Sequence, residues 1–205
     1  VAAAMTGLIE DATWHDKKRP ADFYVIKGIV QNLLDKVGVG SRVVYTATAE
    51  HEEMHPGRTA NIYIDGEFIG FVGEVHPTLA KEYNLDRVYV FELDLQKVME
   101  LSKDPEVYEP VSKFPAIKRD IALLVAEDIQ NSDIINTIKE NGGANLASVN
   151  IFDVYAGEKI DLGFKSLAYT LTFENKERTL TDDEVNKAFD KVVNKLQENY
   201  KAVIR

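Results

Sequence analysis

The second half of the chain contains six segments whose order permits few folds. Residues 120–125, 149–155, 164–173 and 202–204 are typical of β-strands, and residues 131–141 and 182–200 have helical periodicity. Apolar and small polar residues alternate from Phe164 to Phe173, and Thr181 with Glu184 matches a capping box ahead of the second helix. The order strand, helix, strand, strand, helix, strand predicts a four-stranded antiparallel sheet with both helices on one face. The opposite face is left to solvent or to a partner.

The first half is expected to combine helices with a largely antiparallel sheet. Asp22 is a suitable N-cap for a helix that ends at Gly38, and apolar residues recur between them at helical spacing. The dipeptide Asp65-Gly66 favours a tight hairpin turn between two apolar segments. Strands are expected at residues 42–49, 60–64, 68–72 and 88–93, with a short helix from about Pro77.

A domain boundary is expected between Ser102 and Pro115. Pro105, Pro110 and Pro115 interrupt any regular pattern there, so this stretch is interpreted as a linker. A length of 205 residues also exceeds the commonest domain size. We therefore expect two α+β domains, residues 1–103 and residues 112–205. The chain starts at Val1 without an initiating Met or a basic segment, which suggests a cut inside a longer chain rather than a signal peptide.

Composition and charge exclude several classes of protein. The chain has no Cys, which excludes a disulfide framework, a thiolate metal site and a Cys nucleophile. The apolar stretches fall far below the roughly 20 residues that a membrane-spanning helix needs, so no membrane partner is expected. A net charge of -10 argues against a DNA-coating protein. Residues 1–110 carry 11 basic and 19 acidic side chains and residues 111–205 carry 13 and 15, so only the second half suits RNA.

His51, His55 and Glu74 raise the alternative of a metal-dependent enzyme, because imidazole and carboxylate groups bind divalent cations. Pro56 and Gly57 would break the helix that brings both rings together, and the glutamate of a zinc-peptidase motif is not in place. We expect loop residues and no metal site here, and tightly held metal would favour the alternative. The sequence has no nucleophile elbow, phosphate loop or dinucleotide fingerprint, so no catalytic residue is assigned.

Strand alternation places several suitable side chains on the uncovered face of the predicted four-stranded sheet. The residues expected there are Ile151, Asp153 and Tyr155 on one strand and Ser166, Ala168 and Thr170 on the next. An exposed phenol can stack on an unpaired base, and a carboxylate accepts hydrogen bonds from guanine or cytosine. The cations suited to bind phosphates are Lys113, Lys118, Arg119, Lys165, Lys176 and Arg178. The same side chains also fit an ordinary strand end and a solvated surface, so spacing alone leaves both interpretations open.

Longer motifs give a more specific indication. The segments "FPAIKRDIALLV", "IFDVYAG", "GFKSLAYTLTF" and "ERTLTDDEVNKAFDKVVNKL" closely resemble the ferredoxin-fold anticodon-binding domain of the bacterial phenylalanine–tRNA ligase beta chain family. The segments "WHDKKRPADFYVIKGIVQNLL", "HPGRTANIYIDGEFIGFVGEVHP" and "VYVFELDL" resemble the catalytic-like domain that precedes it. Together these motifs cover nearly the whole chain in the family's order.

This resemblance implies a truncated class II synthetase-like antiparallel-sheet domain followed by a ferredoxin-like βαββαβ domain. It implies a non-catalytic part of a cytoplasmic ligase that joins phenylalanine to tRNA(Phe). The alpha subunit, in a heterotetramer, would perform the chemistry with ATP and magnesium, and no cofactor would bind this chain. In agreement, residues 88–93 are not followed by the Gly-x-Gly-x-x-Arg element whose arginine clamps ATP phosphates.

The resemblance also assigns roles to single residues. Asp153, Tyr155 and Ser166 match the family's anticodon-facing positions. Arg119 and Lys165, together with Arg178, are weaker candidates for the RNA backbone, by motif position and charge. A small-molecule-sensing ferredoxin-like regulatory module is a further alternative, and it predicts a ligand-dependent dimer rather than salt-sensitive RNA binding.

Overall fold

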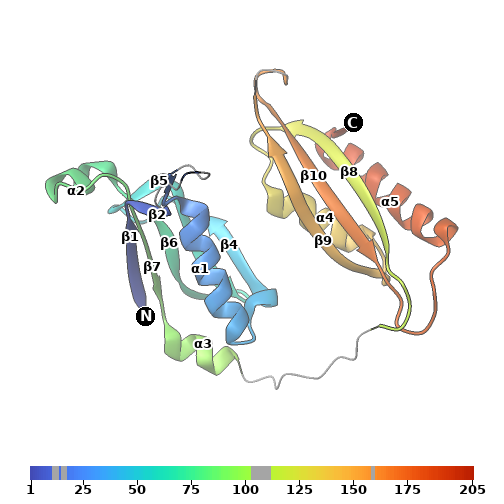
Figure 1. Ribbon diagram of the computed structural model, residues 1–205, viewed down its shortest axis with the longest axis horizontal. Helices are drawn as coiled ribbons and strands as arrows, with labels where there is room; N and C mark the ends of the chain where they lie inside the picture. The colour runs from blue at the N-terminus through green and yellow to red at the C-terminus, as the bar shows by residue number, and fades with distance from the viewer. Residues whose placement is uncertain (11–13, 15–17, 103–111, 158–159) are drawn as a thin grey trace. The chain divides into compact units, whose positions relative to one another are not determined.

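The chain divides into two compact units, residues 1–108 and residues 109–205. A computed structural model describes residues 1–10, 14, 18–102, 112–157 and 160–205 (Figure 1). Most of the stretch interpreted as a linker, residues 103–111, lies outside the described residues. Each unit is therefore described by itself.

The first unit is built on a five-stranded antiparallel sheet with the strand order β1-β7-β6-β5-β4. Its strands are β1 (Ala2–Thr6), β4 (Val43–Ala47), β5 (Met54–Ile64), β6 (Glu67–Val75) and β7 (Val88–Leu93). The short strands β2 (Leu8–Glu10) and β3 (Arg19–Pro20) form a separate pair. The other elements are α1 (Phe23–Lys36), a 3-10 turn η1 (Gly40–Arg42), α2 (Pro77–Glu82) and α3 (Leu95–Leu101).

Helix α1 forms where the sequence predicts it and covers one face of this sheet (Figure 1). The Asp22 side chain accepts a hydrogen bond from the Val25 backbone N–H at 2.8 Å, which caps the first turn. Ile26, Val30 and Leu34 recur on one side of the helix and are buried in the core with sheet residues such as Ile62, Val72 and Phe91.

Three parts of the first unit differ from the sequence-based expectations. Residues Ala2–Thr6 form strand β1 although they are alanine-rich, because pairing with β7 fixes their conformation. Residues Leu95–Leu101 form α3, capped by Asp94, in a stretch for which no helix or strand was predicted. The expectation of loop residues holds for His51 but is wrong for Glu74, which belongs to β6, and for His55, which belongs to β5. A register irregularity between Met54 and Thr59 accommodates Pro56 and Gly57 in that strand.

The second unit has the predicted order of elements. They are β8 (Ile117–Ala126), α4 (Asn131–Asn141), β9 (Leu146–Tyr155), β10 (Phe164–Phe173), α5 (Asp182–Tyr200) and β11 (Val203–Ile204). The strand order is β11-β8-β10-β9, and every neighbouring pair is antiparallel. The predicted α+β class with a ferredoxin-like βαββαβ unit is confirmed.

Both helices of this unit pack on the same face of its sheet, as Figure 1 shows. Leu167, Tyr169, Leu171 and Phe173 of β10 point to that face and are buried with Ile134 and Leu196, among others. The capping box at Thr181 and Glu184 is present in both directions, which confirms its prediction. Among the described residues, no helix is long and apolar enough to span a membrane.

Candidate nucleic-acid interface

The face of the β8–β11 sheet that faces away from α4 and α5 holds the three residues predicted for anticodon contact. Tyr155 of β9 lies directly opposite Ser166 of β10, and Asp153 lies opposite Ala168. Directly opposed residues of antiparallel strands point to the same side. Because the intervening Leu167 is buried under the helices, Tyr155, Asp153 and Ser166 share the uncovered face.

A β-bulge at Phe152 changes which of the neighbouring residues accompany them. The register of β9 against β10 shifts between Ala168 and Tyr169, so Asp153 pairs with Ala168 whereas Ile151 pairs with the fully buried Tyr169. The expectation that Ile151 shares the face of Asp153 is therefore wrong, because the extra residue reverses the alternation. Asn150, opposite Thr170, lies on the uncovered face instead.

The Tyr155 ring lies against the backbone of Gly157. A Cβ atom placed on Gly157 would lie 2.8 Å from the Tyr155 hydroxyl and 2.9 Å from Cζ, closer than real side chains approach. Gly157 therefore provides the space that the phenol occupies. The tyrosine remains 41% exposed. The ring thus keeps an accessible surface for a partner.

Asp153 and Ser166 have different surroundings on this face. Asp153 is exposed, and no described residue forms a hydrogen bond or ion pair with its carboxylate. Ser166 is half-buried in the middle of the sheet, and the Ala168 side chain next to it is small and 8% exposed. The three side chains therefore offer an aromatic ring, a free hydrogen-bond acceptor and a hydroxyl next to the small Ala168 side chain.

Arg119, a candidate for phosphate contact, points to the helix side of the sheet. It lies opposite the buried Leu171, and its guanidinium forms an ion pair with Asp182 at 2.5 Å. The same group also donates to Asn186 Oδ1 of α5. Its charge thus joins β8 to the first turns of α5, on the opposite face from Tyr155.

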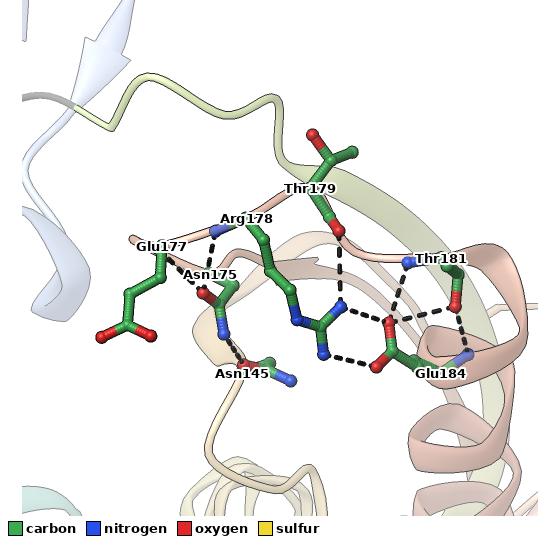
Figure 2. A network of polar contacts seen from close by, with 7 residues as sticks. All are labelled: Asn145, Asn175, Glu177, Arg178, Thr179, Thr181 and Glu184. Atoms are coloured by element: carbon green, nitrogen blue, oxygen red, sulfur yellow. Dashed lines mark hydrogen bonds and ion pairs between the residues drawn. The ribbon is translucent and has the colours of Figure 1, made fainter.

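Arg178 belongs to a polar network at the start of α5 (Figure 2). Its guanidinium donates two hydrogen bonds to the Glu184 carboxylate, at 2.9 and 2.5 Å, and these bonds lower the pKa of Glu184 to about 2. Thr181 donates to the same carboxylate through its backbone N–H and its hydroxyl, both at 3.0 Å. Arg178 therefore stabilises the loop that leads into α5, at the end of β10 away from Ser166.

The remaining cations divide between the two faces. Lys165 lies opposite the buried Val125, and its ammonium donates to the Glu127 backbone carbonyl at 2.8 Å. Lys118, opposite Thr172, is exposed on the same face as Tyr155. Because side chains alternate along β8, Lys118 and Arg119 point to opposite faces of the sheet. This alternation is visible in the sequence and could have distinguished the two cations.

His51 and Glu74, two residues of the metal-site alternative, have partners within the first unit. His51 Nε2 lies 2.8 Å from Asn61 Oδ1, and its ring packs on Phe71 at 4.6 Å between centroids. Glu74 is 3% exposed and pairs with Arg58 at 2.7 Å. The part of the chain that the structure describes has no group of three or more His, Asp or Glu side chains arranged for a metal ion.

One cavity of the first unit has no free cation to hold the phosphates of ATP. This open cavity of 360 Å³ is lined by Glu92 and Asp94 beside Lys97, among others. The Lys97 ammonium is 3.0 Å from Glu67, so its charge is already paired. The two carboxylates could bind magnesium, but a triphosphate also needs a cationic clamp, which this lining does not offer. This cavity is therefore poorly suited to ATP.

Comparisons with known proteins identify the family. Residues 1–95 match the model for the phenylalanyl tRNA synthetase beta chain CLM domain, and residues 112–205 match the ferredoxin-fold anticodon binding domain. Similar curated proteins are the phenylalanine–tRNA ligase beta subunits of Lactiplantibacillus plantarum (48% identical), Latilactobacillus sakei (49%) and Bacillus subtilis (45%). Each match covers 100% of this chain and 25–26% of the relative, so the chain spans about a quarter of their length.

These findings confirm the resemblance seen in the sequence motifs. The two models together account for nearly every residue of the chain, and the relatives align with it over all 205 residues. The chain therefore belongs to the phenylalanine–tRNA ligase beta-subunit family, and it contains that family's CLM domain and its ferredoxin-fold anticodon-binding domain.

Proposed function

We propose that the second unit of this chain binds the anticodon of tRNA(Phe), as part of the beta subunit of a phenylalanine–tRNA ligase. The observation that carries the proposal is the grouping of Tyr155, Asp153 and Ser166 on an uncovered sheet face, in a domain whose family is named for anticodon binding. The proposed role is recognition, and no residue of this chain takes part in the chemistry.

Each side chain has one task in this mechanism. The Tyr155 ring, held over Gly157, stacks on an unpaired anticodon base. The free Asp153 carboxylate accepts hydrogen bonds from the imino and amino donors of guanine. Ser166 adds a hydroxyl contact, and the small Ala168 leaves room for the base between the strands.

Phosphate contacts have a smaller part in this domain than the sequence suggests. Arg119 and Arg178 are held in ion pairs, and Lys165 donates to a backbone carbonyl. Their contribution to RNA affinity would require these contacts to be exchanged. Lys118, exposed on the face of Tyr155, is the better-placed cation. We therefore expect base contacts to outweigh phosphate contacts here.

The rest of the enzyme supplies the other functions under this proposal. An alpha subunit, together with this subunit in a heterotetramer, performs the ATP- and magnesium-dependent charging of the tRNA in the cytoplasm. The first unit serves in folding and subunit contact. This division of labour is supported by the poor fit of its cavity to ATP and by the internal pairing of Arg58 with Glu74.

The test is a titration of tRNA(Phe) against the complete ligase that carries changes in this chain. Tyr155→Ala is expected to weaken binding by about 5- to 150-fold, the range for losing one stacked base. Tyr155→Phe keeps the ring and serves as the matched control, with nearly unchanged affinity. Asp153→Asn should reduce the preference for guanine at the contacted base. Unchanged affinity in correctly folded Tyr155→Ala and Asp153→Ala enzymes would remove the site assignment.

A further inference from the structure

One row of side chains, aromatic or aliphatic at every strand but β10, crosses all four strands on the uncovered face of the second unit. Tyr155 on β9 lies opposite Ser166 on β10, and Ser166 lies opposite Leu124 on β8. Leu124 in turn lies opposite Val203 on β11. These four side chains therefore point to one face. Neighbouring strands are about 4.8 Å apart, so the row is about 14 Å long.

Phe164 places a second aromatic ring beside this row. It precedes Ser166 by two residues on β10 and lies opposite Ala126, in a register that stays regular from Phe164 to Phe173. Phe164 therefore shares the uncovered face and neighbours Ser166, as Tyr155 does from the next strand. Phe164 is 44% exposed and Val203 is 57% exposed. Both offer apolar surface to a partner.

The far end of the same face has a different chemistry. Thr170 donates to Asp120 Oδ1 at 2.6 Å, and Lys118 lies opposite Thr172. Polar groups there are paired with each other or carry charge. The row that contains Tyr155, Leu124 and Val203 thus differs in chemistry from the Asp120 end of the same face.

We propose that this row, defined by Tyr155, Ser166, Leu124, Val203 and the adjoining Phe164, is the path of single-stranded RNA across the sheet. The inference rests on the proposed function, and it adds a binding surface for the nucleotide next to the one on Tyr155. That nucleotide packs its base on Phe164 and Leu124. RNA is the occupant favoured here because the row is continuous with the Tyr155 ring and Asp153 carboxylate, which suit a base.

Under this proposal, the residues of the row add affinity for RNA without selecting the identity of the packed base. Phe164 and Leu124 offer an aromatic face and aliphatic surface but no hydrogen-bonding groups in their side chains, and every base has a face that can pack on them. Asp153 remains the group that distinguishes donors on the neighbouring base. The contacts of Phe164 and Leu124 should therefore contribute equally with any base at the packed position.

The experiment measures the affinity of the complete ligase for a stem-loop RNA that carries the tRNA(Phe) anticodon. Phe164→Ala and Leu124→Ala are each expected to weaken binding by at least about fivefold, the low end for one packed base. The exposed Val203→Asp change provides a second variant that does not enlarge a cavity and should also weaken binding. Thr172→Ala, on the same strand and face as Phe164 but at its polar end, is the control and should bind normally.

The outcomes distinguish the row from the site it extends. If Tyr155→Ala weakens binding while folded Phe164→Ala, Leu124→Ala and Val203→Asp enzymes bind normally, the row is overturned and the proposed function stands. If Tyr155→Ala also has no effect, both fail. If the Phe164 and Leu124 changes leave RNA affinity intact but release the subunit from its complex, the row is a protein interface, which also overturns the proposal. Weaker binding that depends on the identity of the packed base would contradict the sequence-tolerant contact.

Discussion

The two units of this chain are built alike but differ in what lies on the sheet face that their helices leave uncovered. In the first unit, the face opposite α1 is partly closed by the chain itself, because His51 packs on Phe71 and bonds to Asn61. Asn61 is consequently 7% exposed. In the second unit, Asp153 and Tyr155 remain exposed on the corresponding face. Similar architecture thus leaves Asp153 and Tyr155 accessible in the second unit, whereas Asn61 is covered in the first.

Internal pairing in the first unit argues against His51, Arg58 and Glu74 as binding residues. Glu74 and Arg58 neutralise each other, and the histidine is engaged with an amide. In the second unit the paired charges, Arg119 with Asp182 and Arg178 with Glu184, anchor α5 and lie away from the Tyr155 face. A charged residue is therefore informative about binding only after its internal partners are known.

The largest expected effect tests whether the two units are separate in stability as well as in architecture. Ile62 and Leu171 are both fully buried, in two different hydrophobic clusters. Replacing either with Ala should destabilise its own unit by about 2–5 kcal/mol, because a cavity is left in a packed core. Calorimetry of the 205-residue chain should show each variant lowering one transition. A shift of both transitions by either variant would contradict two independent cores.

The next prediction concerns the support of the uncovered face. Gly157→Ala places a methyl group against the Tyr155 ring and should displace it, which weakens binding of the anticodon stem-loop by about fivefold. The measurement is the affinity of the complete ligase. Gly28→Ala is the matched control, since a Cβ at Gly28 meets no atom within 4 Å and the residue lies in α1 of the first unit. Equal affinity of the Gly157→Ala enzyme and the wild type would show that the ring position does not matter.

The smallest expected effect tests whether the ion pair between Arg178 and Glu184 stabilises the second unit. Hydrogen bonds from Arg178 and, to a smaller extent, from the Thr181 backbone and hydroxyl lower the pKa of the Glu184 carboxyl from 4.5 to about 2. A group whose pKa is lower in the folded state stabilises the fold above its unfolded pKa, and this contribution is lost as the pH falls from about 4.5 through 2. Glu184→Gln should therefore lower the denaturation midpoint of the second unit at pH 7, and its deficit should shrink between pH 4.5 and 2.

A second exposed glutamate provides the comparison for that measurement. Glu198 pairs with Lys195 on the surface of α5 at 2.6 Å, and Glu198→Gln should change the midpoint little at pH 7 because exposed pairs contribute little. A Glu184→Gln deficit that stays constant down to pH 2 would contradict the role of the Arg178 ion pair.

Local signals in the sequence predicted the elements that are stabilised locally. Asp22 caps α1, Asp65-Gly66 forms the turn between β5 and β6, and Thr181 with Glu184 starts α5. Asp94, which caps α3, is a similar local signal that the predicted elements did not include. Strand β1 could not be recognised in this way, since its alanine-rich sequence becomes a strand only by pairing with β7.

At the candidate site, too, the sequence predicts what depends on local pattern and misses what depends on strand pairing. Alternation along β10 correctly predicts the face of Ser166, because its register with β8 is regular throughout. The prediction for Ile151 is wrong because the bulge at Phe152 depends on the pairing partner and leaves no mark in the apolar pattern. Partners such as Asp182 for Arg119, 63 residues apart, likewise become visible only in the folded chain.

The bulge in β9 decides which face of the sheet the acid and the phenol occupy. Before Phe152 the strand supplies Ile151 to the core, and after it the strand supplies Asp153 and Tyr155 to the outer face in the opposite phase. If the bulge were flattened with Phe152 kept in the strand, strict alternation would turn both side chains toward the helices. Deleting Phe152 would instead remove the extra residue and leave both on the outer face, so this position should tolerate a one-residue deletion that other positions of β9 would not.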